Sequence, residues 1–291
     1  MDNTDNSANN PKSQSSGADT PMANTPIALT IAGSDSGGGA GIQADLKTFS
    51  ALGAYGASVI TALTAQNTQT VSAIHEVPPA FITEQLNCVL SDLTVTAIKV
   101  GMLASPDIID AVADVLEQHR DIPVVLDPVM VAKSGDSLLS DDALGALKAR
   151  LCPLATVITP NLPEAAKLLA CDEATNEAAV HQQAQALIDT GIAAVLVKGG
   201  HLSGQMSNDV LISGGRTVEF PHTRIDTKNT HGTGCTLSSA IAAGLAKGED
   251  LELAVTRAQA YVHEAIRAAD ELHIGPGHGP VHHFHAFWPR Q

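Results

Sequence analysis

From residue 27 onward, extended apolar runs alternate with segments of helical periodicity, which limits the chain to few folds. This β–α alternation predicts an α/β fold, an open and mostly parallel sheet with helices on both faces. The 291 residues are 44% hydrophobic, which is enough for one large domain. The predicted parallel strands are Ile27–Ala32, Ala57–Leu63, Ala97–Val100, Pro123–Asp127, Thr156–Thr159 and Ala194–Lys198.

Helical patterns are expected between these strands and at the end of the chain. A helix that starts near Ile42 is expected to stop at Gly53, and another carries Ile108, Val112 and Leu116. Further helices are predicted over 177–190, 236–247 and 251–271. Two short strands, Asp209–Ile212 and Thr217–Phe220, flank a Gly-Gly pair and predict a hairpin.

Charge and composition restrict the partners of the chain. A formal charge of −15 disfavours nucleic acid and anionic membranes, and no run of 18 apolar residues predicts a transmembrane helix. The four cysteines form no Cys-x-x-Cys pair, which favours a reduced, cytoplasmic protein. Residues 1–25 are polar and predict either a disordered extension or an artefact at the start codon, and residues 26–291 are expected to form the domain.

The stretch 227–236 reads Thr-Lys-Asn-Thr-His-Gly-Thr-Gly-Cys-Thr and runs into a helix of small residues. A glycine turn at a helix start aims backbone N–H groups and the positive end of the helix dipole at one point, which suits a phosphate. Cys235 would then face the anion through its thiol. The alternative is a small buried apolar cysteine.

Polar and glycine residues follow most predicted strands. In parallel sheets, ligands bind beyond the carboxyl ends of the strands, so these residues predict one contiguous site at a single edge. The groups at these ends are Ser34-Asp35-Ser36 with the glycines to Gly41, Gln66-Asn67, Gly101-Met102, Asp127, Thr159-Pro160-Asn161 and Lys198-Gly199-Gly200-His201.

The run from Gly39 to Ala44 matches a dinucleotide-binding fingerprint, but the second strand ends in Gln66-Asn67 without an acid for the ribose. Close approach of the backbone to a flat ligand explains the glycines better, with a plain tight turn as the alternative. Asp45 falls in the first helical turn, where the dipole stabilises its charge.

Two further polar motifs each allow two interpretations, one as a binding site and one as ordinary local structure. The carboxamide of Gln66 offers a donor beside an acceptor, which matches an aminopyrimidine edge, unless it is a turn residue in water. Asn161 and Glu164 could bind Mg²⁺ directly or through water, or they could form an N-cap with a first-turn acid. Five histidines near the C-terminus fit no standard zinc spacing.

Taken in order, these motifs resemble the hydroxymethylpyrimidine/phosphomethylpyrimidine kinases of thiamin biosynthesis, within the ribokinase-like superfamily. The similarity covers about residues 27–285. It rests on the segments Ala32–Asp45, Thr64–Thr68, Lys99–Leu103, Leu126–Met130, Thr159–Asn161, Val197–His201 and Thr230–Thr236.

The resemblance implies a ribokinase-like three-layer sandwich, a homodimer, and an enzyme that uses ATP and Mg²⁺. It would phosphorylate 4-amino-5-hydroxymethyl-2-methylpyrimidine and then the monophosphate. By similarity, the pyrimidine is lined by Gly33, Asp45, Gln66, Met102, Val129 and Cys235. The nucleotide, metal and transferred phosphate are served by Asp127, Asn161, Glu164, Lys198, Gly232, Thr233 and Gly234.

Sugar kinases of this superfamily place an aspartate base where this chain has Cys235, so a base role for the thiol is a hypothesis. Gln259 stands where relatives often carry a lysine that reaches the nucleotide. The rival functions are a pyridoxal-type kinase, a non-catalytic pyrimidine sensor and, more distantly, a nicotinamide oxidoreductase.

Overall fold

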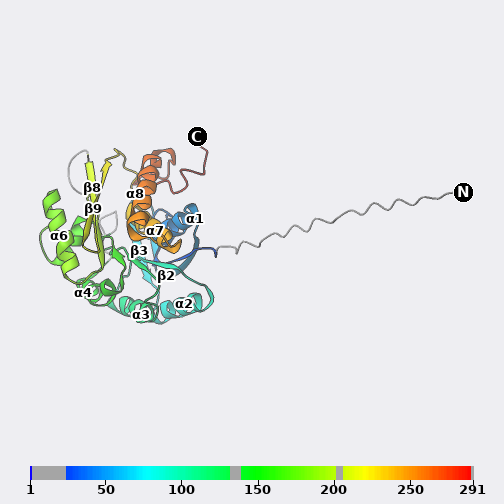
Figure 1. Ribbon diagram of the computed structural model, residues 1–291, viewed down its shortest axis with the longest axis horizontal. Helices are drawn as coiled ribbons and strands as arrows, with labels where there is room; N and C mark the ends of the chain where they lie inside the picture. Colours follow the sequence, from blue (N-terminus) through cyan, green and yellow to red (C-terminus); the bar gives the residue numbers. More distant parts are fainter. Residues whose placement is uncertain (2–23, 132–138, 201–205, 290–291) are drawn as a thin grey trace.

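A single sheet organises the computed structural model, which describes residue 1 and residues 24–131, 139–200 and 206–289. The described strands form a nine-stranded sheet in the order β3-β2-β1-β4-β5-β6-β7-β8-β9. Figure 1 labels β2, β3, β8 and β9 of this sheet. The strands are β1 Ile27–Asp35, β2 Tyr55–Gln66, β3 Val71–Glu76, β4 Ala97–Val100, β5 Val124–Leu126, β6 Val157–Ile158, β7 Ala194–Val197, β8 Met206–Ser213 and β9 Arg216–Thr223.

The middle of the sheet is parallel and its margins are antiparallel. The pairs from β2 through β1, β4, β5 and β6 to β7 are all parallel. At one margin β3 pairs antiparallel with β2, and at the other β8 and β9 form the predicted hairpin across Gly214-Gly215. The mostly parallel sheet predicted from the β–α alternation is therefore confirmed.

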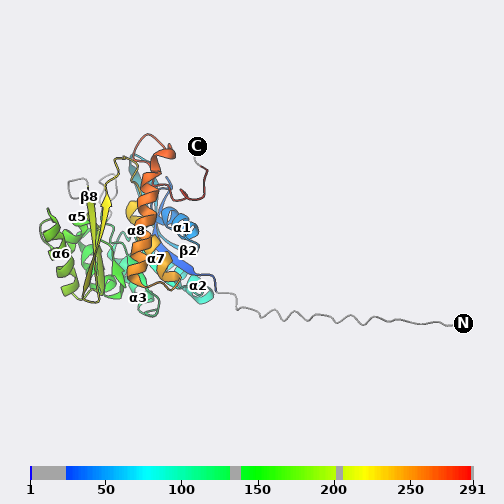
Figure 2. The ribbon, with the colours of Figure 1, turned by 45° about the horizontal axis from the view of Figure 1, so that its top comes forward.

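Helices cover both faces of the sheet and make three layers (Figure 2). One core contains residues of α2, α3, α5 and α6, and the other contains residues of α1, α7 and α8. No helix of the described residues is long and apolar enough to cross a membrane. The helices are α1 Gly41–Ala51, α2 Pro79–Asp92, α3 Pro106–Leu116, α4 Asp141–Ala146, α5 Leu162–Leu169, α6 Glu177–Asp189, α7 Thr233–Ala246 and α8 Leu251–Arg267.

Several elements differ from the sequence expectation. Strand β3 and helix α2 were not predicted, and α7 begins at Thr233 rather than at 236. Helix α8 ends at Arg267 and a short 3₁₀ turn, Ala269–Glu271, follows it. His201 of the Lys198–His201 motif and nearly all of the segment 1–25 lie outside the described residues, so the extension and the domain limits remain predictions.

A buried ion pair joins the sheet to two helices. Lys99 of β4 places Nζ 2.8 Å from Oδ2 of Asp45 in α1, and neither side chain is exposed to solvent. The same carboxylate accepts hydrogen bonds of 2.6 Å from Thr30 Oγ1 of β1 and from Ser239 Oγ of α7. One carboxylate therefore connects β1, β4, α1 and α7.

Removal of one partner of this pair should destabilise the fold strongly. Asp45→Ala leaves the Lys99 ammonium buried without its counter-ion, so we expect the free energy of unfolding to fall by about 3–5 kcal/mol. The double variant Asp45→Leu/Lys99→Met removes both charges and should recover a large part of that loss. Urea denaturation measures both, and a loss below about 1 kcal/mol in Asp45→Ala would contradict the prediction.

Candidate active site

The first turn of α7 is built on a left-handed glycine. Gly232 has φ of +80° and precedes Thr233, whose hydroxyl donates 2.8 Å to the carbonyl of Thr230. A Cβ atom on Gly232 would lie 1.9 Å from the carbonyl oxygen of Gly39, so only glycine fits there. The main-chain N–H groups that open α7 have no intrahelical partner in such a turn and can receive an anion.

The glycines that follow β1 are required by contacts within the protein. A Cβ on Gly39 would lie 2.3 Å from Cδ2 of His231, and one on Gly41 would lie 2.2 Å from the carbonyl oxygen of Gly33. The sequence suggested close approach to a flat ligand, but the close neighbours at Gly39 and Gly41 belong to the chain itself. The two glycine-bearing turns therefore pack directly on each other.

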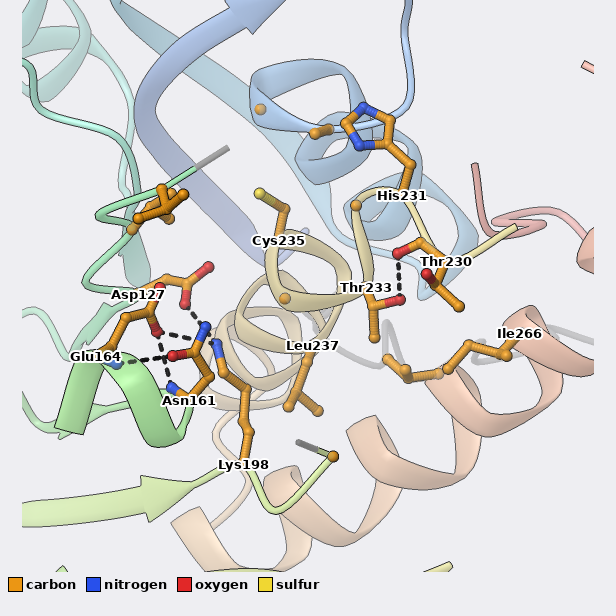
Figure 3. Close-up of a pocket in the computed structure, with 18 of the residues that line it drawn as sticks. Asp127, Asn161, Glu164, Lys198, Thr230, His231, Thr233, Cys235, Leu237 and Ile266 are labelled. Atoms are coloured by element: carbon orange, nitrogen blue, oxygen red, sulfur yellow. Dashed lines mark hydrogen bonds and ion pairs between the residues drawn. The ribbon is translucent and has the colours of Figure 1, made fainter. Parts of the chain in front are cut away.

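Facing the start of α7 is a cluster of two carboxylates, one lysine and one amide (Figure 3). Lys198 Nζ lies 3.0 Å from Oδ1 of Asp127 and 3.8 Å from Oε2 of Glu164. Oδ1 of Asp127 also accepts a hydrogen bond from Thr159, whereas among the described residues its Oδ2 has one hydrogen-bond contact, a long one of 3.4 Å from Ser238. A Cβ atom on Gly234 would lie 3.6 Å from that Oδ2.

Asn161 and Glu164 form a capping box at the start of α5. Asn161 Oδ1 accepts from the Glu164 amide and Glu164 Oε2 accepts from the Asn161 amide, each at 2.8 Å. This is the N-cap that the sequence left open as the alternative to metal binding. Both side chains also line the cavity, and a carboxylate keeps further lone pairs, so the two roles are compatible.

Burial sets the charges of this cluster. It raises the pKa of Glu164 to about 7, and Lys198 only partly opposes the rise. Burial also acts to raise the pKa of Asp127, but Lys198 and Lys99 together lower that pKa below its usual range. At neutral pH, Asp127 is therefore an anion, whereas Glu164 is protonated in part of the molecules.

One cavity of about 1270 Å³ collects nearly every predicted site residue. Its walls include, from the predicted pyrimidine set, Gly33, Gln66, Met102, Val129 and Cys235, and from the predicted nucleotide, metal and phosphate set, Asp127, Asn161, Glu164, Lys198, Gly232, Thr233 and Gly234. Asp45 is the exception and does not line the cavity. Its carboxylate is buried and pairs with Lys99, which itself lines the cavity, so the place of Asp45 beside the pyrimidine stays a prediction.

Cys235 sits half-buried in the first turn of α7. Burial raises the pKa of its thiol to about 11, although Lys99 acts in the opposite direction. In the structure the thiol is therefore protonated at neutral pH, and the helix start does not produce a thiolate.

Comparison with known proteins agrees with the motifs. A sequence model described as phosphomethylpyrimidine kinase matches residues 35–282.

The chain belongs to the phosphomethylpyrimidine kinase family.

It is 59% identical over 264 residues to a hydroxymethylpyrimidine/phosphomethylpyrimidine kinase of Rhizobium meliloti, covering 91% of this chain and 99% of that protein. It is 53% identical over 255 residues to the thiamine biosynthesis bifunctional protein ThiED of Geobacter sulfurreducens, covering 88% of this chain and 51% of that protein. A solved ADP complex of Bacillus subtilis pyridoxal kinase is 38% identical with a TM-score of 0.82, covering 89% of this chain and 97% of the other. The ribokinase-like architecture is thereby confirmed.

Three residues of this phosphomethylpyrimidine kinase family member received no individual role from the sequence, although Asp35 was among the strand-end groups expected at the site. Lys99 is a fully buried lysine, and its position within the apolar strand Ala97–Val100 was the available signal for a buried counter-ion. Asp35 and His231 pair at 2.9 Å between the two glycine turns. No feature of the sequence predicts that these two side chains pair, because 196 residues separate them in the chain.

Gln259, which stands where relatives often carry a lysine, hydrogen-bonds to another buried side chain. Gln259 of α8 is buried and its Nε2 donates 2.6 Å to Oδ2 of Asp209, whose Oδ1 accepts from the Gly199 amide at 2.7 Å. The C-terminal histidines do not gather, and the described residues hold no group of three or more His, Cys, Asp or Glu arranged for a metal. His283 instead contacts Thr236 Oγ1 at 3.1 Å, and burial lowers its pKa to about 3.

The raised pKa of Glu164 makes stability depend on pH. The folded state holds a proton that the unfolded state loses near pH 4.5, so stability should fall as pH rises from about 5 to 7, approaching 1.4 kcal/mol per pH unit. Glu164→Gln keeps a cap acceptor and removes the charge, so its curve should be flatter over that window. Urea denaturation of both proteins without nucleotide or metal measures this, and parallel curves would refute it.

Proposed function

We propose that the protein is an ATP-dependent kinase that phosphorylates 4-amino-5-hydroxymethyl-2-methylpyrimidine and then its monophosphate, in the formation of thiamin diphosphate. The observation that carries the proposal is the single cavity that joins the Gln66 wall to the Gly232–Cys235 turn. Identity of 59% to a protein named for this activity supports the substrate, against 38% to a pyridoxal kinase.

The cavity residues fit a nucleotide with its metal. Within the described residues, Asp127 Oδ2 has a single long hydrogen-bond contact beside Gly234, and Lys198 supplies a half-buried cation next to this carboxylate. Asp127, with Glu164 and Asn161 through water, would hold Mg²⁺, which neutralises phosphate charge when bound. The ADP complex of the pyridoxal kinase supports a nucleotide in this architecture.

In the proposed reaction the hydroxymethyl oxygen bonds to the γ-phosphorus of ATP, and the bond from that phosphorus to ADP breaks. The hydroxyl proton passes to a base or to solvent. The amides of the Gly232–Cys235 turn would stabilise the charge on the equatorial oxygens, and the Thr233 amide would exchange its 3.3 Å bond to the Thr230 carbonyl for this role. Alignment of the hydroxymethyl oxygen with the γ-phosphorus by the cavity would supply most of the rate enhancement, because phosphoryl transfer needs no covalent intermediate with the protein.

An assay of ADP release tests the substrate. The pyrimidine alcohol and its monophosphate should both be phosphorylated, and kcat/KM for the alcohol should exceed that for pyridoxine by about tenfold or more. The reverse preference would favour the pyridoxal-type kinase, which shares the fold. Tight calorimetric binding of the alcohol with no ADP release would favour the non-catalytic pyrimidine sensor. The presence of Cys235, Asn161 and Glu164 favours an enzyme over such a sensor.

The same assay tests Cys235 as the base. If the thiol accepts the proton, Cys235→Ala should lower kcat by about 10²-fold or more. Because the thiol pKa is about 11, kcat of the unmodified protein should then keep rising with pH above neutrality. A near-normal kcat in Cys235→Ala would assign the cysteine to the pyrimidine wall alone.

We also infer a cytoplasmic homodimer. All four cysteines are free, which suits a reducing compartment and is checked by cell fractionation. The β2–β3 margin of the sheet exposes the apolar side chains of Leu63 and Ile74, which a second copy of the chain would cover. Sedimentation at micromolar concentration should give twice the 30.0 kDa chain mass, and Leu63→Lys should lower it.

A further inference from the structure

The carboxylate of Asp35 organises the turn after β1. Its Oδ1 accepts a hydrogen bond from the Gly37 amide at 2.8 Å. Its Oδ2 accepts from the amides of Gly39 at 3.0 Å and Ala40 at 2.9 Å, and lies 2.9 Å from Nε2 of His231. An ionised carboxylate only accepts hydrogen bonds, so His231 must carry its proton on Nε2.

This proton conflicts with the neighbouring amide of Gln66. The Nε2 atom of Gln66 lies 3.4 Å from the same His231 nitrogen, and two donors would face each other there. At the other end of the amide, Thr64 Oγ1 lies 3.1 Å from Gln66 Oε1 and 3.0 Å from the carbonyl oxygen of Ser34. The single hydroxyl proton of Thr64 points to one of these acceptors, so in this orientation the other oxygen faces a lone pair of Thr64 Oγ1.

Exchange of the oxygen and nitrogen of Gln66 removes both conflicts at once, since the two amide orientations fill the same space. The Gln66 amino group then donates to Thr64 Oγ1, and Thr64 donates to the Ser34 carbonyl. The Gln66 carbonyl oxygen then faces the His231 N–H, which donates mainly to Asp35 at 2.9 Å and reaches Gln66 as a weaker second acceptor at 3.4 Å. We infer that His231, held by Asp35, fixes the orientation of the Gln66 amide and thereby selects the heterocycle edge that the cavity accepts.

The orientation matters because Gln66 lines the cavity with one N–H and one carbonyl lone pair left over. An aminopyrimidine offers an amino donor beside a ring-nitrogen acceptor, and it pairs with an amide only when the order of the two groups matches. The opposite orientation sets donor against donor and acceptor against acceptor. This deepens the proposed function and rests on it for the identity of the substrate.

His231 is well placed for such a positioning role. Its main chain is fixed on the outer side, where its amide donates 3.0 Å to the Gly279 carbonyl and its carbonyl accepts 3.2 Å from the Val281 amide. The next residue, Gly232, opens the α7 turn. Heterocycle recognition and the proposed phosphate turn are therefore set by adjacent residues of one rigid segment.

Two substitutions at His231 test the inference. His231→Leu removes the N–H donor, whereas His231→Gln offers a side-chain amide N–H in about the same place. We expect His231→Leu to raise KM for the pyrimidine alcohol about tenfold, with KM for ATP within about twofold, and to erode the preference over pyridoxine. His231→Gln should recover most of the loss. Thr64→Val, which removes the acceptor for the Gln66 amino group, should shift the same KM in the same direction.

Equal KM values for the alcohol in His231→Leu and His231→Gln would overturn the inference, and so would a parallel rise in KM for ATP. If His231→Leu does not fold, as judged by its thermal transition, Thr64→Val decides, and an unchanged KM there overturns it. Failure of the proposed function gives a different result in the assay, because the unsubstituted protein itself would then release no ADP with the alcohol. Calorimetric Kd values for the alcohol then replace KM in the same comparison.

Discussion

The ion pair between Asp45 and Lys99 is the constraint around which the site is arranged. Two charges removed from water are stable only with good geometry and further hydrogen bonds, and Thr30 and Ser239 supply those. Because the four groups come from β1, β4, α1 and α7, the pair fixes α7 against the parallel strands. The glycine turn that opens α7 is thereby held over the strand ends, beside Asp127.

The charge at the cavity is more nearly balanced than the net charge of the whole molecule. The chain carries −15, yet the carboxylate of Asp127 is matched by Lys198 at 3.0 Å. Burial meanwhile raises the pKa of Glu164 to about 7, so this carboxyl carries only part of a negative charge at that pH. A divalent cation at this cluster would displace the Glu164 proton, so metal binding and proton release are coupled there. An acidic protein can thus accept a polyanion at one edge of its sheet.

The sequence was informative where burial imposes a pattern. Parallel strands such as Ala97–Val100 are buried on both faces and appear as continuous apolar runs, and their ends locate the site. Strand β3 exposes nearly all its side chains and so carries no such pattern. Asp45 was predicted at the pyrimidine through the family resemblance, and from position alone as a first-turn acid, whereas α1 begins at Gly41 and has no acid in its first turn. Its ion pair with Lys99 joins residues 54 positions apart and could not be predicted from local sequence.

Position 259 was expected from the family resemblance to carry a lysine that reaches the nucleotide, and the structure gives its glutamine another partner. An amide at position 259 brings no charge, and Gln259 turns to Asp209 instead of the cavity centre. Asp209 in turn holds the Gly199 amide, directly after Lys198. The amide thus acts on Lys198 through main-chain position. Under the proposed function, the phosphate charge then falls to Lys198 and to the N–H groups of the α7 turn, which makes the geometry of that turn more important here than a further cation on α8.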